Sequence, residues 1–386
     1  MTQPAGESSA GVAVTVDALA NTLVALYAQA EQDLLTALAR VARHGLNDTT
    51  ATAQLAMLGQ MRRTAQRLVT SLALRTGPLT SRVVEQAARD GDAAALRALR
   101  AAVAGHQGLA RLYLADTGHR IASANMIAID LASKLDATRA GIVRFADDAY
   151  RAAVADTSTR LILSREQLTP TTAQQRAWTE LTRRGITGYT DTAGRSWNLS
   201  SYVEMATRTT VQRAYNAAHE ARMTSVGIEF FTISHDGRPC PLCKPWEGAI
   251  LSTGPTGLVS TSHALTGRPT GVRVAGTIEQ ARAAGLQHPN CKHILLPYFP
   301  GVTRTGGTSG WSTADEQRYR ATQQLRRMER ELRAAKRQQA AALDDLARQR
   351  AARRIRAYQA RIREHTGRHG LVRRRRREQL DLGNKP

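Results

Sequence analysis

The chain has 386 residues, a formal net charge of +22 at pH 7, 42% hydrophobic residues and only 4% aromatic ones. This length is enough for two or three domains with hydrophobic cores of their own. The positive charge predicts a polyanionic partner, either nucleic acid or an acidic protein surface, whereas the few aromatic rings argue against a platform that stacks single-stranded bases.

The sequence carries no sign of export or membrane insertion. Residues 1–14 are small and polar, without the basic start and apolar core of a secretory signal, and we expect them to be disordered. No apolar run approaches the roughly eighteen residues of a membrane span. Three cysteines, an odd number, fit metal binding in a reducing cytoplasm better than disulfides. We therefore expect no membrane partner.

Residues 15–168 are predicted to form a helical docking module. Apolar side chains recur every three or four residues from Leu19 to Val41, which is the period of an amphipathic helix. Asn47-Asp48-Thr49 interrupts this helix and offers a new N-cap. Gly77-Pro78 predicts a turn, after which a third helix is expected to begin at Thr80-Ser81.

Residues 169–302 are predicted to form a small α+β domain that begins at Thr169-Pro170. A helix is expected at 171–183 and a longer one at 200–223. The β-branched and aromatic content predicts three strands, at 229–234, 249–252 and 294–296. Between them, residues 254–276 are rich in Gly, Thr, Ser and Pro and are expected to be an exposed loop. The predicted fold class is therefore mostly α with a small α+β domain.

All three cysteines fall in this domain, at spacings that indicate a metal site. Cys240 and Cys243 form a Cys-x-x-Cys knuckle that can aim two thiolates at one point, and Cys291 lies between His288 and His293. Three thiolates and either histidine would complete a tetrahedral zinc site. We predict a structural zinc knuckle and leave the choice of histidine open.

Other interpretations of these residues stay open. A redox pair would need a strand-to-helix pattern around Cys240 and Cys243, and none is present. A zinc deaminase would need a His-x-Glu element, but His219 and Glu220 are adjacent. An HNH-like metal nuclease would need a paired catalytic histidine followed by a helix. The plainest alternative is three small buried thiols beside loop histidines.

Separated residues between Asp191 and Gly301 resemble one known family, in the same order along the chain. The resembling positions include Trp197, Tyr202, Arg208, Thr209, His235, Arg238, Trp246, Gly248 and Asn290. This pattern resembles the phage minor capsid protein 2 family, relatives of the Mu F-like head morphogenesis proteins. In that family the Asn-Cys-x-His element is firmer than the cysteine pair, which makes His235 a substitute for Cys240 as a ligand.

The resemblance implies a structural minor capsid protein of a tailed bacteriophage, carried in the virion and assembled in the host cytoplasm. It would act in head assembly or DNA packaging near the portal, by binding to portal or capsid proteins rather than by catalysis. The alternative is an enzyme, either a metal-dependent nuclease or an ADP-ribosyltransferase-type effector. Glu204 and Arg208 share a helix face and could position a nucleotide, although an ion pair is the simpler interpretation. Ser262-His263 has no acid nearby and is not expected to be catalytic.

The carboxyl-terminal region is the most basic part of the chain. Residues 303–313 are predicted to be a Gly-rich linker. Residues 314–386 contain 22 Lys and Arg against 9 Asp and Glu and are predicted to form a basic helical tail. The tail has a thin apolar stripe that can pair with another helix. A run of five arginines should stay solvated until it meets phosphates or acidic side chains. We predict non-specific DNA binding through this run, with a scaffold-docking tail as the alternative. The run is Arg373, Arg374, Arg375, Arg376 and Arg377.

Overall fold

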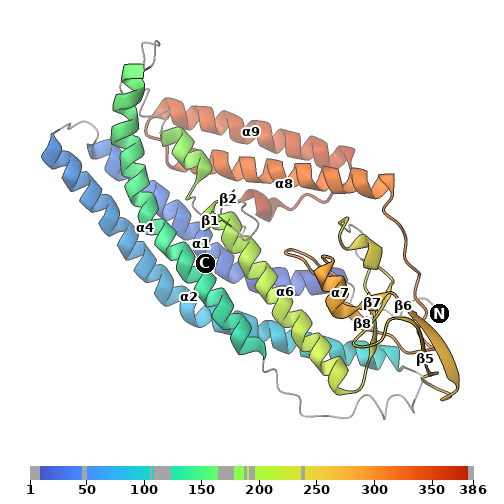
Figure 1. Ribbon diagram of the computed structural model, residues 1–386. Coiled ribbons are helices and arrows are strands. Elements are labelled where there is room, and N and C mark those ends of the chain that lie inside the picture. Colours follow the sequence, from blue (N-terminus) through green and yellow to red (C-terminus); the bar gives the residue numbers. More distant parts are fainter. Residues whose placement is uncertain are drawn as a thin grey trace. The chain divides into compact units, whose positions relative to one another are not determined.

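The computed structural model describes residues 9–45, 50–104, 107, 123–163, 178–186, 189–190, 196–235 and 240–380 (Figure 1). By contacts the chain divides into two compact units, each assembled from separate segments. Unit 1 comprises Met1–Ala20, Thr80–Leu131 and Met205–Arg320, and unit 2 comprises Asn21–Leu79, Ala132–Glu204 and Ala321–Pro386. The successive domains expected from the sequence stay a prediction, and the expected boundary at Thr169-Pro170 lies outside the described residues.

Unit 1 contains a four-stranded sheet with the strand order β7-β4-β3-β8. The central strand β3 pairs antiparallel with β4 and with β8, while β7 pairs parallel with β4. All four residues of β3 are buried, as their apolar content requires. The strands are β3 (Phe230–Ile233), β4 (Ile250–Ser252), β7 (Gly276–Thr277) and β8 (Leu295–Pro297). The three strands predicted from the sequence are therefore confirmed.

Helices complete the core of unit 1. The predicted helix at 200–223 is confirmed as α6 (Leu199–Ser225), and the short α7 (Ile278–Ala283) follows β7. Thr277 and Gln280 cap α7 reciprocally, each side chain accepting a hydrogen bond from the other's backbone N–H. One apolar cluster then joins side chains of helices and sheet. It includes Leu99, Met223, Phe231, Leu251, Ile278 and Leu295.

Two buried arginines of α6 form ion pairs with aspartates of unit 1. Arg222 forms two hydrogen bonds with the carboxylate of Asp92, at 2.6 and 3.0 Å, and Arg208 lies 3.5 Å from Asp17. A buried charge without such a partner would be strongly destabilising. These pairs therefore fix α6 against other segments of unit 1.

Residues 254–276 are not the irregular loop that the sequence analysis expected. They contain a β-hairpin in which β5 (Gly257–Ser262) pairs antiparallel with β6 (Pro269–Val274). Burial along β6 has the two-residue period of a strand, since Val272 and Val274 are buried at alternate positions and pack against Phe230. The high Gly, Ser and Thr content of the segment made this period hard to recognise in the sequence. The expectation of exposure holds for most of β5, where Leu258 is 75% exposed.

In its described residues, unit 2 is mostly helical and also contains a two-residue ladder between β1 (Tyr189–Thr190) and β2 (Ser196–Trp197). The helix α1 begins at Ser9, so residues 9–14 are helical instead of disordered, and residues 1–8 lie outside the described part. Its apolar repeat is buried as predicted. The other long helices are α2 (Ala51–Ala102), α4 (Ser123–Leu163), α8 (Thr313–Ala340) and α9 (Asp345–Arg368). Of these five helices, α9 lies wholly in unit 2, and the other four contribute residues to both units. Among the described residues, no helix has the length and apolar content needed to cross a membrane.

The turn predicted at Gly77-Pro78 is wrong, because α2 continues through Pro78. A proline inside a helix removes one hydrogen bond and costs about 3 kcal/mol. Here Pro78 is on the exposed side of the helix, while Leu72, Thr76 and Thr80 are buried on the other side at spacings of four. Burial of this continuous helix face outweighs the local cost of the proline. The Gly-Pro pair by itself contains no information about that burial.

The basic carboxyl-terminal segment is folded into unit 2. The thin apolar stripe pairs α8 with α9, and the two helices lie side by side in Figure 1. The cluster between them contains Leu325, Met328, Leu332 and Ile362. The indole N–H of Trp178 donates to the carbonyl of Ala341 at 2.6 Å, so this segment is tied to residues far away in the sequence. Of the predicted helix at 171–183, residues 171–177 lie outside the described part and 178–184 are helical.

We expect Gly91→Ala to lower the free energy of unfolding by about 1–3 kcal/mol. Gly91 lies in α2, and a Cβ built there would overlap the backbone carbonyl of Tyr215 in α6. Gly59→Ala is the matched control in the same helix, because only the movable guanidinium of Arg63 lies near its added Cβ. The control should be neutral or stabilising by up to about 1 kcal/mol. Urea unfolding of both variants tests this; equal stability would contradict the close helix crossing.

Candidate metal centre

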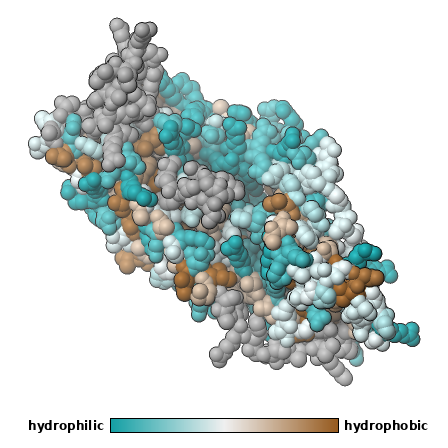
Figure 2. All heavy atoms as spheres, in the orientation of Figure 1, coloured by the Kyte–Doolittle hydropathy of each residue, from teal (hydrophilic) through white to brown (hydrophobic). Residues whose placement is uncertain are grey.

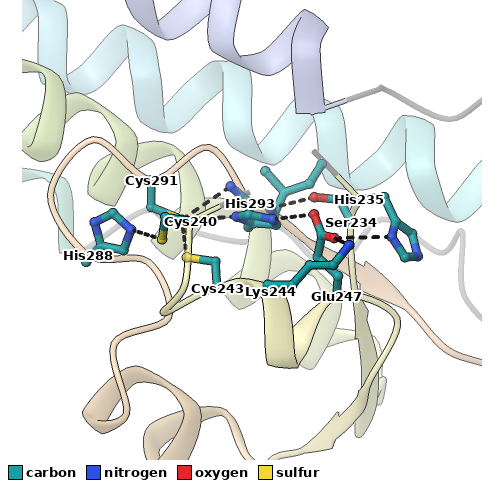
Figure 3. A network of polar contacts seen from close by, with 10 residues as sticks. Ser234, His235, Cys240, Cys243, Lys244, Glu247, His288, Cys291 and His293 are labelled. Atoms are coloured by element: carbon teal, nitrogen blue, oxygen red, sulfur yellow. Dashed lines mark hydrogen bonds and ion pairs between the residues drawn. The ribbon is translucent and has the colours of Figure 1, made fainter. Parts of the chain in front are cut away.

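The structure brings the predicted cysteines and histidines together on two loops of unit 1. One loop follows β3 and leads into the 3₁₀ helix η1 (Lys244–Trp246), and the other connects α7 to β8. The Sγ of Cys240 lies 3.0 Å from Nε2 of His288, and the Sγ atoms of Cys243 and Cys291 are 3.5 Å apart. Nδ1 of His293 is 3.4 Å from the Sγ of Cys291 (Figure 3).

These side chains form two overlapping sets that can hold a metal ion. One set is Cys240, Cys243 and His288, and the other is Cys243, Cys291 and His293; within each set the donor atoms lie within 4.8 Å of one another. Cys243 belongs to both. Thiolate and imidazole donors suit Zn²⁺ and several other soft or borderline ions. The donor set therefore fits a metal ion without fixing its identity.

The local backbone explains how the two loops aim their donors. The amides of Cys243 and Lys244 both donate to the carbonyl of Cys240, which closes the knuckle. In the second loop the amide of Cys291 donates to the carbonyl of His288, and Asn290 has a φ of 67°. Asparagine is one of the few residues that tolerate this left-handed conformation. Asn290 thus turns the chain where His288 faces Cys240 and His293 faces Cys291.

Both histidines use their second ring nitrogen to hold a fixed orientation. Nε2 of His293 lies 3.0 Å from Oε1 of Glu247, and Nδ1 of His288 lies 2.8 Å from the carbonyl oxygen of Pro289. Metal-binding histidines generally donate their free ring N–H to a carboxylate or a backbone carbonyl, which sets the tautomer. The arrangement therefore leaves Nδ1 of His293 and Nε2 of His288 directed toward sulfur.

Glu247 is a site residue that the sequence analysis missed. Its side chain is only 1% exposed and contacts Nζ of Lys244 at 3.1 Å, in addition to His293. His235 approaches from the exposed side, with Nδ1 3.6 Å from Oε2 of Glu247. The two metal-capable sets do not include His235, which lies against the carboxylate instead of the sulfurs. Its position in the sequence, between the family-motif residues Trp246 and Gly248, is the one feature that could have marked it as a site residue.

The electrostatics of the cluster favour the thiolate form of two of its three cysteines. Hydrogen bonding from the Cys243 thiol, with His288 adding to it, lowers the pKa of Cys240 to about 4. The same thiol and His293 lower the pKa of Cys291 to about 4, whereas the pKa of Cys243 is raised. Burial lowers the pKa of His293, but Cys291 and Glu247 together raise it to about 9. Thiolates prepared in this way are the ligand form that metals bind.

The sequence profile of the phage minor capsid protein 2 family matches residues 14–366. The chain belongs to this family. No curated protein and no solved structure matches it. The family identifies a structural phage protein and a virion component, and the motif residues noted in the sequence can now be placed within the fold of a minor capsid protein.

Several family-motif residues have clear structural roles. Gly248 has a φ of 74°, and a Cβ built there would lie 2.5 Å from the carbonyl oxygen of Gly307. Trp246 packs against the apolar core of unit 1, and Trp197 pairs with Tyr189 between β2 and β1. On α6, Tyr202 and Thr209 are half-buried and Arg208 pairs with Asp17. Arg238 lies outside the described residues. Nδ1 of His263 accepts a hydrogen bond from the amide of Leu265, which is a loop-fixing role.

Purified protein is expected to carry one metal ion per chain, and Cys243→Ser should lose it because this residue belongs to both ligand sets. His263→Ala, outside both sets, is the control and should retain the ion. Elemental mass spectrometry of the folded proteins measures the content, and comparison of His288→Ala with His293→Ala identifies the histidine ligand. A folded wild-type protein without metal would exclude the site.

Gly248→Ala and Gly307→Ala separate a close approach from backbone strain. Both glycines have φ near 70°, but no atom lies within 4 Å of a Cβ built on Gly307. We expect Gly307→Ala to cost about 1–2 kcal/mol from its left-handed backbone alone. Gly248→Ala should cost about 1–3 kcal/mol more because of the carbonyl in its path. Thermal unfolding measures both, and equal losses would show that the two segments do not pack closely.

Proposed function

We propose that this protein is a structural component of a tailed-phage head that acts in head assembly or DNA packaging near the portal, by binding to portal or capsid proteins. The observation that carries the proposal is the family match over residues 14–366, which spans both compact units. Its basic carboxyl-terminal segment would meet the packaged DNA. The helices within residues 15–168 would supply the docking surface for the capsid partner.

In this proposal the metal is zinc and its role is structural. The contacts Cys240–His288 and Cys243–Cys291 each join residues 48 positions apart, so one ion would close a long loop of unit 1. Three thiolates and one histidine complete the tetrahedral coordination of a zinc ion and leave no position for water. This ligand pattern is typical of structural rather than catalytic zinc sites. Such an ion contributes on the order of ten kcal/mol to folding.

The contacts of Glu204 and Arg208 support a binding role over catalytic turnover. Glu204 lies 4.0 Å from Arg333 and 3.5 Å from Arg377, within unit 2. Arg208 lies beside Asp17 within unit 1. Both side chains that could position a nucleotide, Glu204 and Arg208, thus lie beside an opposite charge. Glu247, the carboxylate beside the cysteines, bonds to a histidine ring and has the geometry of an orienting group.

Depletion of the protein during infection tests the proposal. The protein should co-purify with tail-free heads, and its depletion should lower the yield of heads or the DNA content per head. Electron microscopy and quantitative mass spectrometry of gradient-purified heads measure these outcomes. Complementation with His235→Ala, an exposed position on the rim of the cluster, should restore the yield if no catalysis is involved. Absence from purified heads, or normal DNA-filled heads after depletion, would refute the proposal.

A further inference from the structure

We propose that the exposed face of α9 is a binding surface for the phosphate backbone of double-stranded nucleic acid. This inference deepens the proposed function, since it names the surface that would meet DNA. It rests on the contrast between arginines that the fold pairs internally and arginines that it leaves exposed. The five-arginine run, which the sequence favoured for this task, falls largely in the first group.

The run at 373–377 is held by unit 2 itself. The guanidinium of Arg373 donates two hydrogen bonds to the buried carboxylate of Glu378, at 2.5 and 2.6 Å. Arg377 lies 3.5 Å from Glu204, and its carbonyl accepts a hydrogen bond from Arg333 at 2.6 Å. The expectation that the whole run is solvated is therefore wrong, because its acidic partners come from its own chain. Of the five side chains, only that of Arg375 is exposed, and the other four are half-buried.

One side of α9 is fixed against α8, which makes the helix a rigid support. Ala351 and Ile362 are buried, and Nε2 of His365 lies 2.8 Å from the carbonyl oxygen of Ala321. The side chain of Asp344 caps the amino-terminal end by accepting from the amide of Ala347 at 2.6 Å. The other side of the helix is consequently presented to solvent in a single orientation.

That exposed side carries a dense set of arginines. The helix holds eight arginines and two acidic residues, and seven of the arginines are exposed. Arg348 pairs with Asp345, and Arg368 pairs with Glu364. Within the described part of the chain no ion pair engages the remaining five, and hydrophilic residues cover the region of α8 and α9 in Figure 2. The five are Arg350, Arg353, Arg356, Arg361 and Arg363.

The chemistry of this face fits phosphates better than a protein surface or stacked bases. Protein interfaces place apolar and aromatic side chains at their centre. On α9, by contrast, the one exposed large apolar side chain is that of Leu346, at the amino-terminal end of the helix. Its single aromatic residue, Tyr358, is half-buried and lies under the guanidinium of Arg361 at 5.6 Å, so no ring is free for base stacking. Arginines on a rigid helix match the sequence-independent charge of duplex phosphates.

The test compares two triple variants of the full chain that remove the same charge. Arg350, Arg353 and Arg356 are changed to Gln in one, and Arg63, Arg67 and Arg75 of α2, all exposed, are changed to Gln in the other. Fluorescence anisotropy with a mixed-sequence 30-base-pair DNA duplex gives the affinity as a function of salt. Circular dichroism melting verifies that both variants keep the wild-type fold.

We expect the α9 variant to bind the duplex at least about tenfold more weakly at low salt, with the control within about twofold of wild type. The slope of log affinity against log salt should fall by about 2.7 in magnitude for three lost phosphate contacts. Equal weakening of both variants would show that net charge alone acts and would overturn the proposal. So would an unchanged α9 variant.

Two further results separate this inference from the proposed function. Binding of wild-type protein to polyglutamate but not to the duplex would assign the face to an acidic protein and overturn the inference. Head incorporation of the α9 variant is scored independently of its DNA affinity. Protein present in heads without any affinity for duplex DNA would remove only the α9 inference, whereas protein with that affinity but absent from heads would remove only the capsid role.

Discussion

A buried carboxylate governs the organisation of unit 1. Glu247 is almost fully removed from water, and such a charge is tolerated only when hydrogen-bonding partners surround it. His293 and Lys244 supply those partners from opposite directions, and His235 covers the exposed edge. Because His293 belongs to the second loop, satisfying Glu247 also brings Cys291 to Cys243. The contact between His293 and Glu247 therefore compensates the buried charge and also brings the metal ligands together.

Buried charge pairs also constrain α6 outside the cluster, including the family-motif residue Arg208. Arg208 with Asp17 and Arg222 with Asp92 fix α6 in unit 1, while Glu204 serves the same purpose for Arg333 in unit 2. Each pair joins segments far apart in sequence. Removal of either partner would leave a buried charge without its counter-charge, so the ion pair by itself constrains both positions.

The sequence was sufficient where a local pattern controls the outcome. Cys240, Cys243 and Cys291 were found from their spacing, β3 from its β-branched and aromatic content, and α6 from its helical period, because these signals lie within a few residues. It was insufficient where distant contacts decide. Pro78 remains helical because its neighbours are buried on the opposite side, the hairpin at 257–274 depends on packing against Phe230, and Glu247 is recognisable only once His293 lies beside it.

The location of Trp178 changes how the Gly-rich segment at 303–312 should be understood. This segment contains neither helix nor strand and resembles a linker between a folded domain and an independent tail. Yet the residues beyond it supply the carbonyl that accepts the buried indole N–H of Trp178, and Gln338 donates to the carbonyl of Thr179. A proteolytic cut at 303–312 would therefore release no autonomous fragment. The two halves would stay associated until unit 2 itself unfolds.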